Sequence, residues 1–297
     1  MLTVEHLTKS YGNTPVLKDL SFDIQSGSIC GFVGKNGAGK TTFFHSLLHF
    51  VTYQGHISLD GEKITKKTYP KIGYLPEERS LMPKLSVFQQ VSYLARLKGM
   101  TDAQIKKELP LWMERLEVKG KPSDKIKSLS KGNQQKIQLI ITLIHKPDLI
   151  ILDEPFSGLD PVNTAILKNV IFEEKERGAT IIFSDHVMTN VEELCDQLIM
   201  IQDGQIALNG SISDIRNSFG KTRLYLSPEV AIDSLKDIPE ILEIKKTNQG
   251  QWRLILANEE IGKEIFNRVS AGHYLSTFDQ QAPSIDDIFK LKSGALS

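Results

Sequence analysis

The chain has 297 residues, and its 36 Lys and Arg residues balance 36 Asp and Glu residues, so its formal net charge is zero. Hydrophobic residues at 40% and charged residues at 24% are typical of globular proteins and exclude disordered and fibrous classes, while the length suggests two domains. The neutral balance does not predict a broad basic surface for nucleic acid. Two cysteines cannot form a disulfide framework, which favours a reducing compartment such as the cytosol.

No segment of the sequence is predicted to cross a membrane. The first twenty residues lack the layout of a signal peptide. The most apolar stretch, residues 137–152, is too short and too polar to span a bilayer.

Strands and helices are expected to alternate as far as Leu208. The predicted strands are residues 2–8, 18–24, 28–33, 55–60, 71–75, 148–153, 179–184, 197–202 and 205–208. The predicted helices are residues 40–49, 87–116 with a break at Leu109–Pro110, 130–145, 161–177 and 187–195. The strand over 28–33 is apolar on both faces, as in a buried central strand. This alternation predicts an α/β domain with a largely parallel sheet.

The segment after Gly220 has a different pattern. Its predicted elements are a strand over 223–226, a helix over 230–236, strands over 241–246 and 252–257, a helix over 259–269 and a strand over 273–278. This βαββαβ order is the ferredoxin-like pattern. A short helix is predicted over 284–291, where Ser284 and Asp287 have the spacing of a capping box. We therefore expect one domain over residues 1–220 and a smaller one over 221–297.

A phosphate-binding loop is predicted after the strand at 28–33. The residues from Gly34 to Thr41 match the pattern G-x-x-x-x-G-K-[ST] in full. Glycines allow successive N–H groups to point at phosphate oxygens, and the helix that follows adds its positive end. Lys40 would reach the β- and γ-phosphates, and the Thr41 hydroxyl would coordinate Mg²⁺. The alternative is a chance match in a glycine-rich turn, and the strand before the loop and the helix after it argue against that.

Two acidic residues follow another apolar strand. Asp153 and Glu154 come directly after the run Leu149–Leu152. The carboxyl end of a buried parallel strand is where an open α/β sheet binds ligands. Asp153 would hold Mg²⁺, and Glu154 could accept a proton from the attacking water. The alternative is that both residues simply cap the end of the strand. The presence of the phosphate-binding loop argues against that alternative.

Five further motifs complete a specific resemblance. In chain order they are Tyr11 in KSYG, Glu77 in GYLPE, Ser130 and Gly132 in LSKGNQQ, Asp160 in SGLD, and His186 in SDH. Over about residues 1–215 the chain resembles the ATP-binding subunits of ATP-binding-cassette (ABC) transporters. The tail, with PSIDDIF over residues 283–289, resembles the extension of cassettes similar to the sodium- and drug-export ATPases.

The resemblance implies a fold, ligands and roles. The fold would be a P-loop cassette, with a RecA-like core and antiparallel β and α-helical subdomains, followed by the ferredoxin-like domain. ATP would be bound by Tyr11, Gly34, Lys35, Asn36, Gly37, Ala38, Gly39, Lys40, Thr41, Thr42, Glu77, Ser130, Gly132 and Asp160. Mg²⁺ would be held by Thr41, Asp153 and Glu77. Catalysis would rest on Glu154, His186 and Lys40.

In that family two cassettes pack head to tail around two ATP molecules. Lys40 and Glu154 of one copy would then face Ser130 and Gly132 of the other, where Ser130 caps a helix whose positive end points at the γ-phosphate. Two departures from the family pattern stand out. Glu77 stands where the broad family has glutamine. Its carboxylate can still ligate Mg²⁺, but its negative charge also allows repulsion in the metal-free state. Lys131 and Asn133 stand where the commonest signature has glycine and glutamine, a change that bears on the tuning of activity and not on its existence.

Three functions remain open at this point. The first is an ATPase at the cytoplasmic face of the membrane that drives a separate permease, with a second cassette as partner, and the tail favours export. The helical region 87–116 would then dock the permease. The second is a cassette ATPase acting on DNA or ribosomes, against which the span 42–129 shows no sustained heptads. The third is a nucleotide sensor without catalysis, which Glu154 and His186 argue against. The C-terminal domain is expected to support or regulate the dimer.

Overall fold

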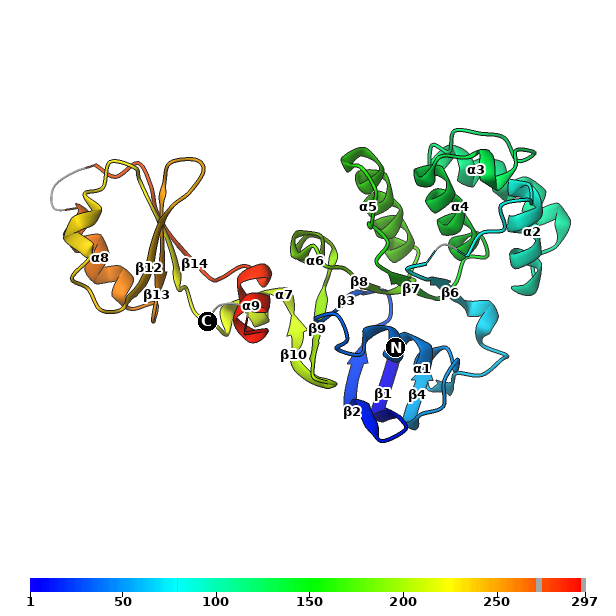
Figure 1. Ribbon diagram of the computed structural model, residues 1–297, viewed down its shortest axis with the longest axis horizontal. Helices are drawn as coiled ribbons and strands as arrows, with labels where there is room; N and C mark the ends of the chain where they lie inside the picture. Colours follow the sequence, from blue (N-terminus) through cyan, green and yellow to red (C-terminus); the bar gives the residue numbers. More distant parts are fainter. Residues whose placement is uncertain (79, 271–273, 295–297) are drawn as a thin grey trace. The chain divides into compact units, whose positions relative to one another are not determined.

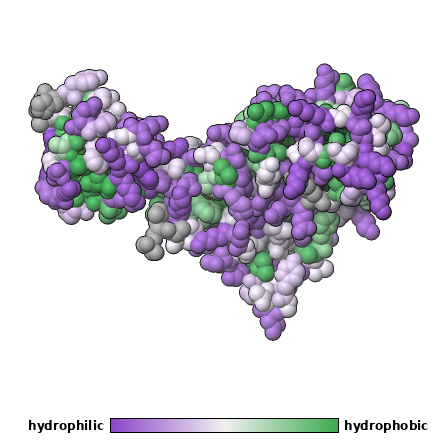
Figure 2. All heavy atoms as spheres, turned by 45° about the horizontal axis from the view of Figure 1, so that its top comes forward, coloured by the Kyte–Doolittle hydropathy of each residue, from purple (hydrophilic) through white to green (hydrophobic). Residues whose placement is uncertain are grey.

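The computed structural model describes residues 1–78, 80–270 and 274–294. It divides into two compact units, Met1–Asn209 and Gly210–Ser297, and each is described by itself (Figure 1). The sequence places a domain boundary after Gly220, whereas helix α7 (Ile212–Asn217) clusters with the second unit. Hydrophilic residues cover much of the surface that Figure 2 shows on each unit. Among the described residues, none of the helices combines the length and the apolar character that crossing a membrane requires.

A six-stranded sheet forms the centre of the first unit. Its strands follow the order β10-β9-β3-β8-β7-β6. They are β3 (Ile29–Val33), β6 (Ile72–Leu75), β7 (Leu149–Asp153), β8 (Thr180–Ser184), β9 (Gln197–Gln202) and β10 (Gln205–Ser211). The pairs β3–β9, β3–β8, β8–β7 and β7–β6 are parallel. Every residue of β3, β7 and β8 is buried, which explains their continuous apolar sequences and confirms the predicted α/β class.

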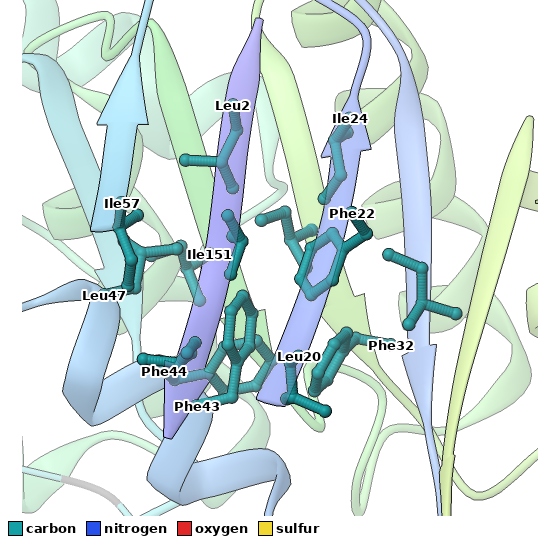
Figure 3. Close-up of a cluster of buried hydrophobic side chains, with 14 of the residues drawn as sticks. Leu2, Leu20, Phe22, Ile24, Phe32, Phe43, Phe44, Leu47, Ile57 and Ile151 are labelled. Atoms are coloured by element: carbon teal, nitrogen blue, oxygen red, sulfur yellow. The ribbon is translucent and has the colours of Figure 1, made fainter. Parts of the chain in front are cut away.

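A smaller antiparallel sheet lies on one side of this central sheet. It has the order β2-β1-β4-β5, with β1 (Leu2–Tyr11), β2 (Thr14–Ile24), β4 (Gln54–Leu59) and β5 (Glu62–Lys63). Helix α1 (Lys40–Leu47) is packed into the apolar core between the two sheets, and Figure 3 shows its Phe43 and Phe44 among residues of both. The rings of Phe43 and Phe32 stack with centroids 4.3 Å apart. This core fixes the helix that follows the glycine-rich loop.

Helices α4 (Lys131–Leu143), α5 (Pro161–Glu176) and α6 (Met188–Leu194) cover the opposite face of the central sheet (Figure 1). Helices α2 (Val87–Leu97) and α3 (Asp102–Arg115) pack against α4. The break predicted at Leu109–Pro110 is wrong, because Pro110 lies inside α3 on its exposed side. The chain instead leaves α2 at Gly99, whose φ is 91°, and Thr101 begins α3 with a capping box. The remaining predicted elements of this unit are present, with ends shifted by a few residues.

The second unit holds the predicted ferredoxin-like sheet. Its order is β12-β13-β11-β14, and all pairs are antiparallel. The elements are β11 (Arg223–Leu226), β12 (Ile241–Lys246), β13 (Trp252–Leu256), α8 (Ile261–Ser270) and β14 (Phe278–Gln281). The helix predicted over 230–236 is wrong: the chain forms a 3₁₀ turn over Ile232–Leu235. The last strand begins at Phe278, where the prediction ended, and His273 lies outside the described residues.

Helix α9 (Ile285–Lys292) shows a partly formed cap. The Ser284 hydroxyl accepts a hydrogen bond from the Asp287 N–H at 3.1 Å, as predicted. The Asp287 carboxylate does not complete the box by returning to Ser284. It accepts hydrogen bonds from Arg223 and Arg253 of the sheet instead, because pairing with a buried guanidinium is stronger than capping. This contact ties α9 to β11 and β13.

Candidate active site

Parallel strands bring the predicted site residues to one edge of the central sheet. The glycine-rich loop follows β3, Asp153 ends β7, and Ser184 ends β8. Asp153 pairs with Ser184 in register, and Leu75 of β6 pairs with Leu152 of β7. Because these strands run in the same direction, the residues that follow them emerge side by side.

The loop after β3 is shaped around Lys40. This lysine is buried, and its ammonium donates hydrogen bonds to the backbone oxygens of Gly34 at 2.8 Å and Lys35 at 3.4 Å. Gly39 has a φ of 111°, and a Cβ there would lie 2.7 Å from a Leu17 methyl group. Among the residues that the structure describes, no side chain caps the N-terminus of α1, so the first N–H groups of the helix can bind an anion.

A serine that the sequence did not single out holds the Asp153 carboxylate and the backbone of Glu154 in place. The fully buried Ser184 hydroxyl donates to Asp153 Oδ1 at 2.6 Å and accepts from the Glu154 N–H at 3.0 Å. Glu154 adopts a positive φ of 52°, in the left-handed region, directly after the last residue of β7. The signal in the sequence is the position of Ser184 at the end of β8, which becomes meaningful only when β8 is known to lie beside β7.

Glu154 and His186 contact each other through Oε1 and Nε2. Burial raises the pKa of the Glu154 carboxyl, and Glu77 and Asp153 raise it further, while His186 and Lys40 oppose this change. Burial lowers the pKa of the Lys40 ammonium, against the opposing effect of the nearby carboxylates. A carboxylate with a raised pKa is a better proton acceptor, which suits a general base.

These residues enclose a cleft of about 370 Å³. The predicted residues that line it are Asn36, Gly37, Gly39, Lys40, Thr41, Thr42, Glu77, Asp153, Glu154 and His186, and Val16 joins them without having been predicted. Three carboxylates, the Thr41 side chain and one ammonium therefore line the same cleft. Hard oxygen donors of this kind suit Mg²⁺. Within the described ranges no three His, Cys, Asp or Glu side chains are grouped to hold a metal, and Mg²⁺ commonly completes its shell with water and phosphate oxygens.

Comparison with known proteins decides the family. A model of the ABC transporter family matches residues 17–157, and a model of the C-terminal domain of DrrA1-3-like ATP-binding proteins matches residues 210–292. The ABC transporter ATP-binding protein YhaQ of Bacillus subtilis is 43% identical over 297 residues, covering all of this chain and 99% of YhaQ. The chain belongs to the ATP-binding subunits of ABC transporters. As a member of this family it binds ATP and is an ATPase.

Two further comparisons agree with this assignment. The linearmycin resistance ATP-binding protein LnrL of B. subtilis is 32% identical, and the match covers 97% of each chain. A solved structure of an ATP-binding subunit of an ABC transporter is 29% identical, with a TM-score of 0.70, and the match covers 74% of this chain and 93% of that one.

Several residues predicted to bind ATP do not line this cleft. Tyr11 is 48% exposed, with the Lys9 ammonium 4.8 Å from its ring centroid. Ser130 caps α4, as predicted, and accepts a hydrogen bond from the Asn133 N–H at 3.3 Å. Asp160 caps α5 through the Asn163 N–H at 2.9 Å.

The remaining loop and signature residues are accounted for separately. Gly132 lies in the first turn of α4. Gly34, Lys35 and Ala38 contribute backbone to the loop and are not among the lining residues of the cleft. The cleft of a single chain therefore holds the P-loop half of the predicted site, and the signature half lies elsewhere on the cassette.

Proposed function

We propose that this cassette binds ATP with Mg²⁺, hydrolyses it, and thereby drives a separate transmembrane permease at the cytoplasmic face of the membrane. The observation that carries the proposal is the cleft in which Lys40, Asp153, Glu154 and His186 converge beside the P-loop. Lys40 would hold the β- and γ-phosphates, and Thr41, Asp153 and Glu77 would hold Mg²⁺. The bound Mg²⁺ would neutralise charge on the phosphates.

Glu154 and His186 would position and deprotonate water. Glu154 Oε1 would accept the proton of a water aligned with the γ-phosphate, and His186 Nε2, which contacts this oxygen, would keep the carboxylate oriented. We infer that Ser130, Gly132 and Asp160 act on the ATP of a second cassette, because they lie outside the cleft of their own chain. Tyr11 would stack on the adenine.

Glu154→Gln tests the assignment of the base. Turnover should fall by more than about a hundredfold, since general-base catalysis contributes about 10²–10⁴ in rate, while ATP binding stays within about threefold. Glu176→Gln, at an exposed site at the end of α5, is the matched control and should retain full turnover. Steady-state phosphate release and equilibrium binding of a fluorescent ATP analogue measure the two effects. Normal turnover in Glu154→Gln would remove Glu154 from this role.

A second cavity supports coupling to a permease. A largely apolar groove of about 520 Å³ lies between β6 and helices α2 and α4, and Phe50 and Leu97 line it although 60% and 66% exposed. Its described lining includes Lys98, His45 and His145 but no Asp or Glu. We propose that an amphipathic helix of the permease, with an apolar face and a carboxylate, docks here. Pro76 also lines the groove and directly precedes Glu77, so docking would adjoin the nucleotide cleft.

Co-purification with the membrane subunit tests this docking. Leu97→Asp places a charge in the groove and should abolish co-purification and stimulation of the ATPase by the permease. The basal ATPase of the free cassette should remain. Leu111→Asp is the matched control, because Leu111 is 53% exposed on α3 and does not line the groove. Equal loss of co-purification in both variants would refute the groove as the docking site. If the unaltered protein co-purifies with no membrane partner, a cassette acting on DNA or ribosomes would be favoured.

The direction of transport is proposed to be export. LnrL, whose match covers 97% of this chain, is named for linearmycin resistance. Export of a toxic compound is one way to confer resistance.

The C-terminal unit, which matches the DrrA1-3-like family model, is proposed to support or regulate the cassette dimer. Deleting residues after Gly220 and measuring ATP-dependent dimerisation tests this role, and unchanged dimerisation would count against it.

A further inference from the structure

Three carboxylates share the cleft that would receive the phosphates of ATP. Glu77, Asp153 and Glu154 line it together, and Lys40 is the single lysine or arginine among its described lining residues. The same three carboxylates also line a small adjoining cavity. Glu77 therefore adds a negative charge to the cleft in which the negatively charged phosphates of ATP would bind. A glutamine at this position would have nearly the same shape without the charge.

The position of Glu77 is fixed by the sheet and by α4. Leu75 pairs with Leu152 in parallel register, so the segment after β6 emerges next to Asp153 and Glu154. The side-chain amide of Gln138, which is 6% exposed, donates a hydrogen bond to the backbone oxygen of Glu78 at 3.2 Å. The backbone on both sides of Glu77 is thus held against the core. Its carboxylate also acts on its neighbours, since it raises the pKa of Glu154.

We propose that Glu77 makes nucleotide binding conditional on a divalent cation, an inference that rests on the proposed ATP site. With Mg²⁺ present, the Glu77 carboxylate is an oxygen ligand and faces a cation that offsets its charge. Without Mg²⁺, the same carboxylate repels the phosphates and opposes the attraction of Lys40. A glutamine would keep the ligand oxygen and lose the repulsion. The cleft would therefore discriminate against metal-free ATP before any chemistry occurs.

The test compares binding with and without metal. Wild-type protein, Glu77→Gln and the control Glu78→Gln are titrated with a fluorescent ATP analogue, once in excess Mg²⁺ and once in EDTA. Glu78 is also exposed and loses the same charge when substituted, but it does not line the cleft. In EDTA, Glu77→Gln should bind about tenfold more tightly than wild type, the effect of one like charge near a surface. In Mg²⁺ it should lie within about threefold of wild type, and Glu78→Gln should match wild type in both.

The possible outcomes separate this inference from the proposed function. If the unaltered protein binds no analogue even in Mg²⁺, the nucleotide site itself is refuted, and this inference with it. If wild type binds in Mg²⁺ but Glu77→Gln shows the same ratio of affinities with and without metal, only the inference is overturned. An equal gain in Glu78→Gln would also overturn it, because the effect would then come from net charge. Thermal unfolding of each variant confirms that the comparison is made between folded proteins.

Discussion

Replacing Ser184 by alanine removes the hydroxyl that links the Asp153 carboxylate to the backbone of Glu154. In the structure this hydroxyl donates to Asp153 at 2.6 Å and accepts from the Glu154 N–H at 3.0 Å. Its side chain is fully buried, so water cannot replace either bond. Alanine would leave the Asp153 oxygen and the Glu154 N–H without these partners. The perturbation therefore affects stability and the position of both acids at once.

The magnitude follows from the two lost bonds. A hydrogen bond to a charged group contributes about 1.5–3 kcal/mol, and a buried N–H left unpaired costs about 1–3 kcal/mol. Allowing for relaxation, the free energy of unfolding of the first unit should fall by about 2–4 kcal/mol. For a domain of this size each kcal/mol lowers Tm by about 2–4 °C, which gives a decrease of about 4–16 °C. The value of kcat should fall more than the affinity for ATP, because the role proposed for Glu154 is toward the attacking water rather than the phosphates.

Differential scanning calorimetry and steady-state phosphate release measure these effects. Ser128→Ala is the matched control, since its exposed hydroxyl donates to the backbone oxygen of Lys125 at 2.7 Å and its loss should cost less than about 1 kcal/mol. If Ser184→Ala unfolds within about 1 kcal/mol of wild type and keeps its turnover, the inferred role of the Ser184 bridge is refuted.

Two further predictions concern charged groups away from the cleft. Asp287→Asn removes the carboxylate shared by Arg223 and Arg253 and should cost the second unit about 3 kcal/mol, because Arg223 is only 3% exposed. Asp286→Asn, whose side chain is half-exposed beside Lys290, should cost about 0.5 kcal/mol or less. Hydrogen exchange of the β11 and β13 amides measures both costs, and equal costs would contradict the stabilising role of the buried pair. Burial lowers the pKa of His145 from 6.5 to about 4, so its neutral form stabilises the fold above pH 6.5 and this stability is lost as pH falls towards 4. The loss reaches about 3 kcal/mol, and His145→Gln should flatten the dependence of Tm on pH in that range; an unchanged slope would show that other groups cause it.

The sequence by itself determined the parts of this protein that depend on neighbouring residues. The P-loop is one uninterrupted segment, and its glycines and Lys40 are needed whatever packs around them, since they set the local backbone and the charge. The same holds for Ser130 and Ser284, which cap the helices that directly follow. The apolar strands before Gly34 and Asp153 were predictable because burial on both faces leaves a continuous apolar run.

Only the tertiary structure decided which distant residues share the cleft. Glu77 shares the cleft with Asp153 because β6 pairs with β7. Ser184 contacts Asp153 and the backbone of Glu154 because β8 lies on the other side of β7. No local pattern encodes the order of strands in a sheet, because that order is set by packing between segments far apart in the chain. For the same reason, Asp287 has the spacing of a capping box, but its carboxylate bonds to Arg223 of β11 and Arg253 of β13. The local sequence determined the chemistry that each residue could contribute. Strand pairing determined which of these residues lie together in the cleft.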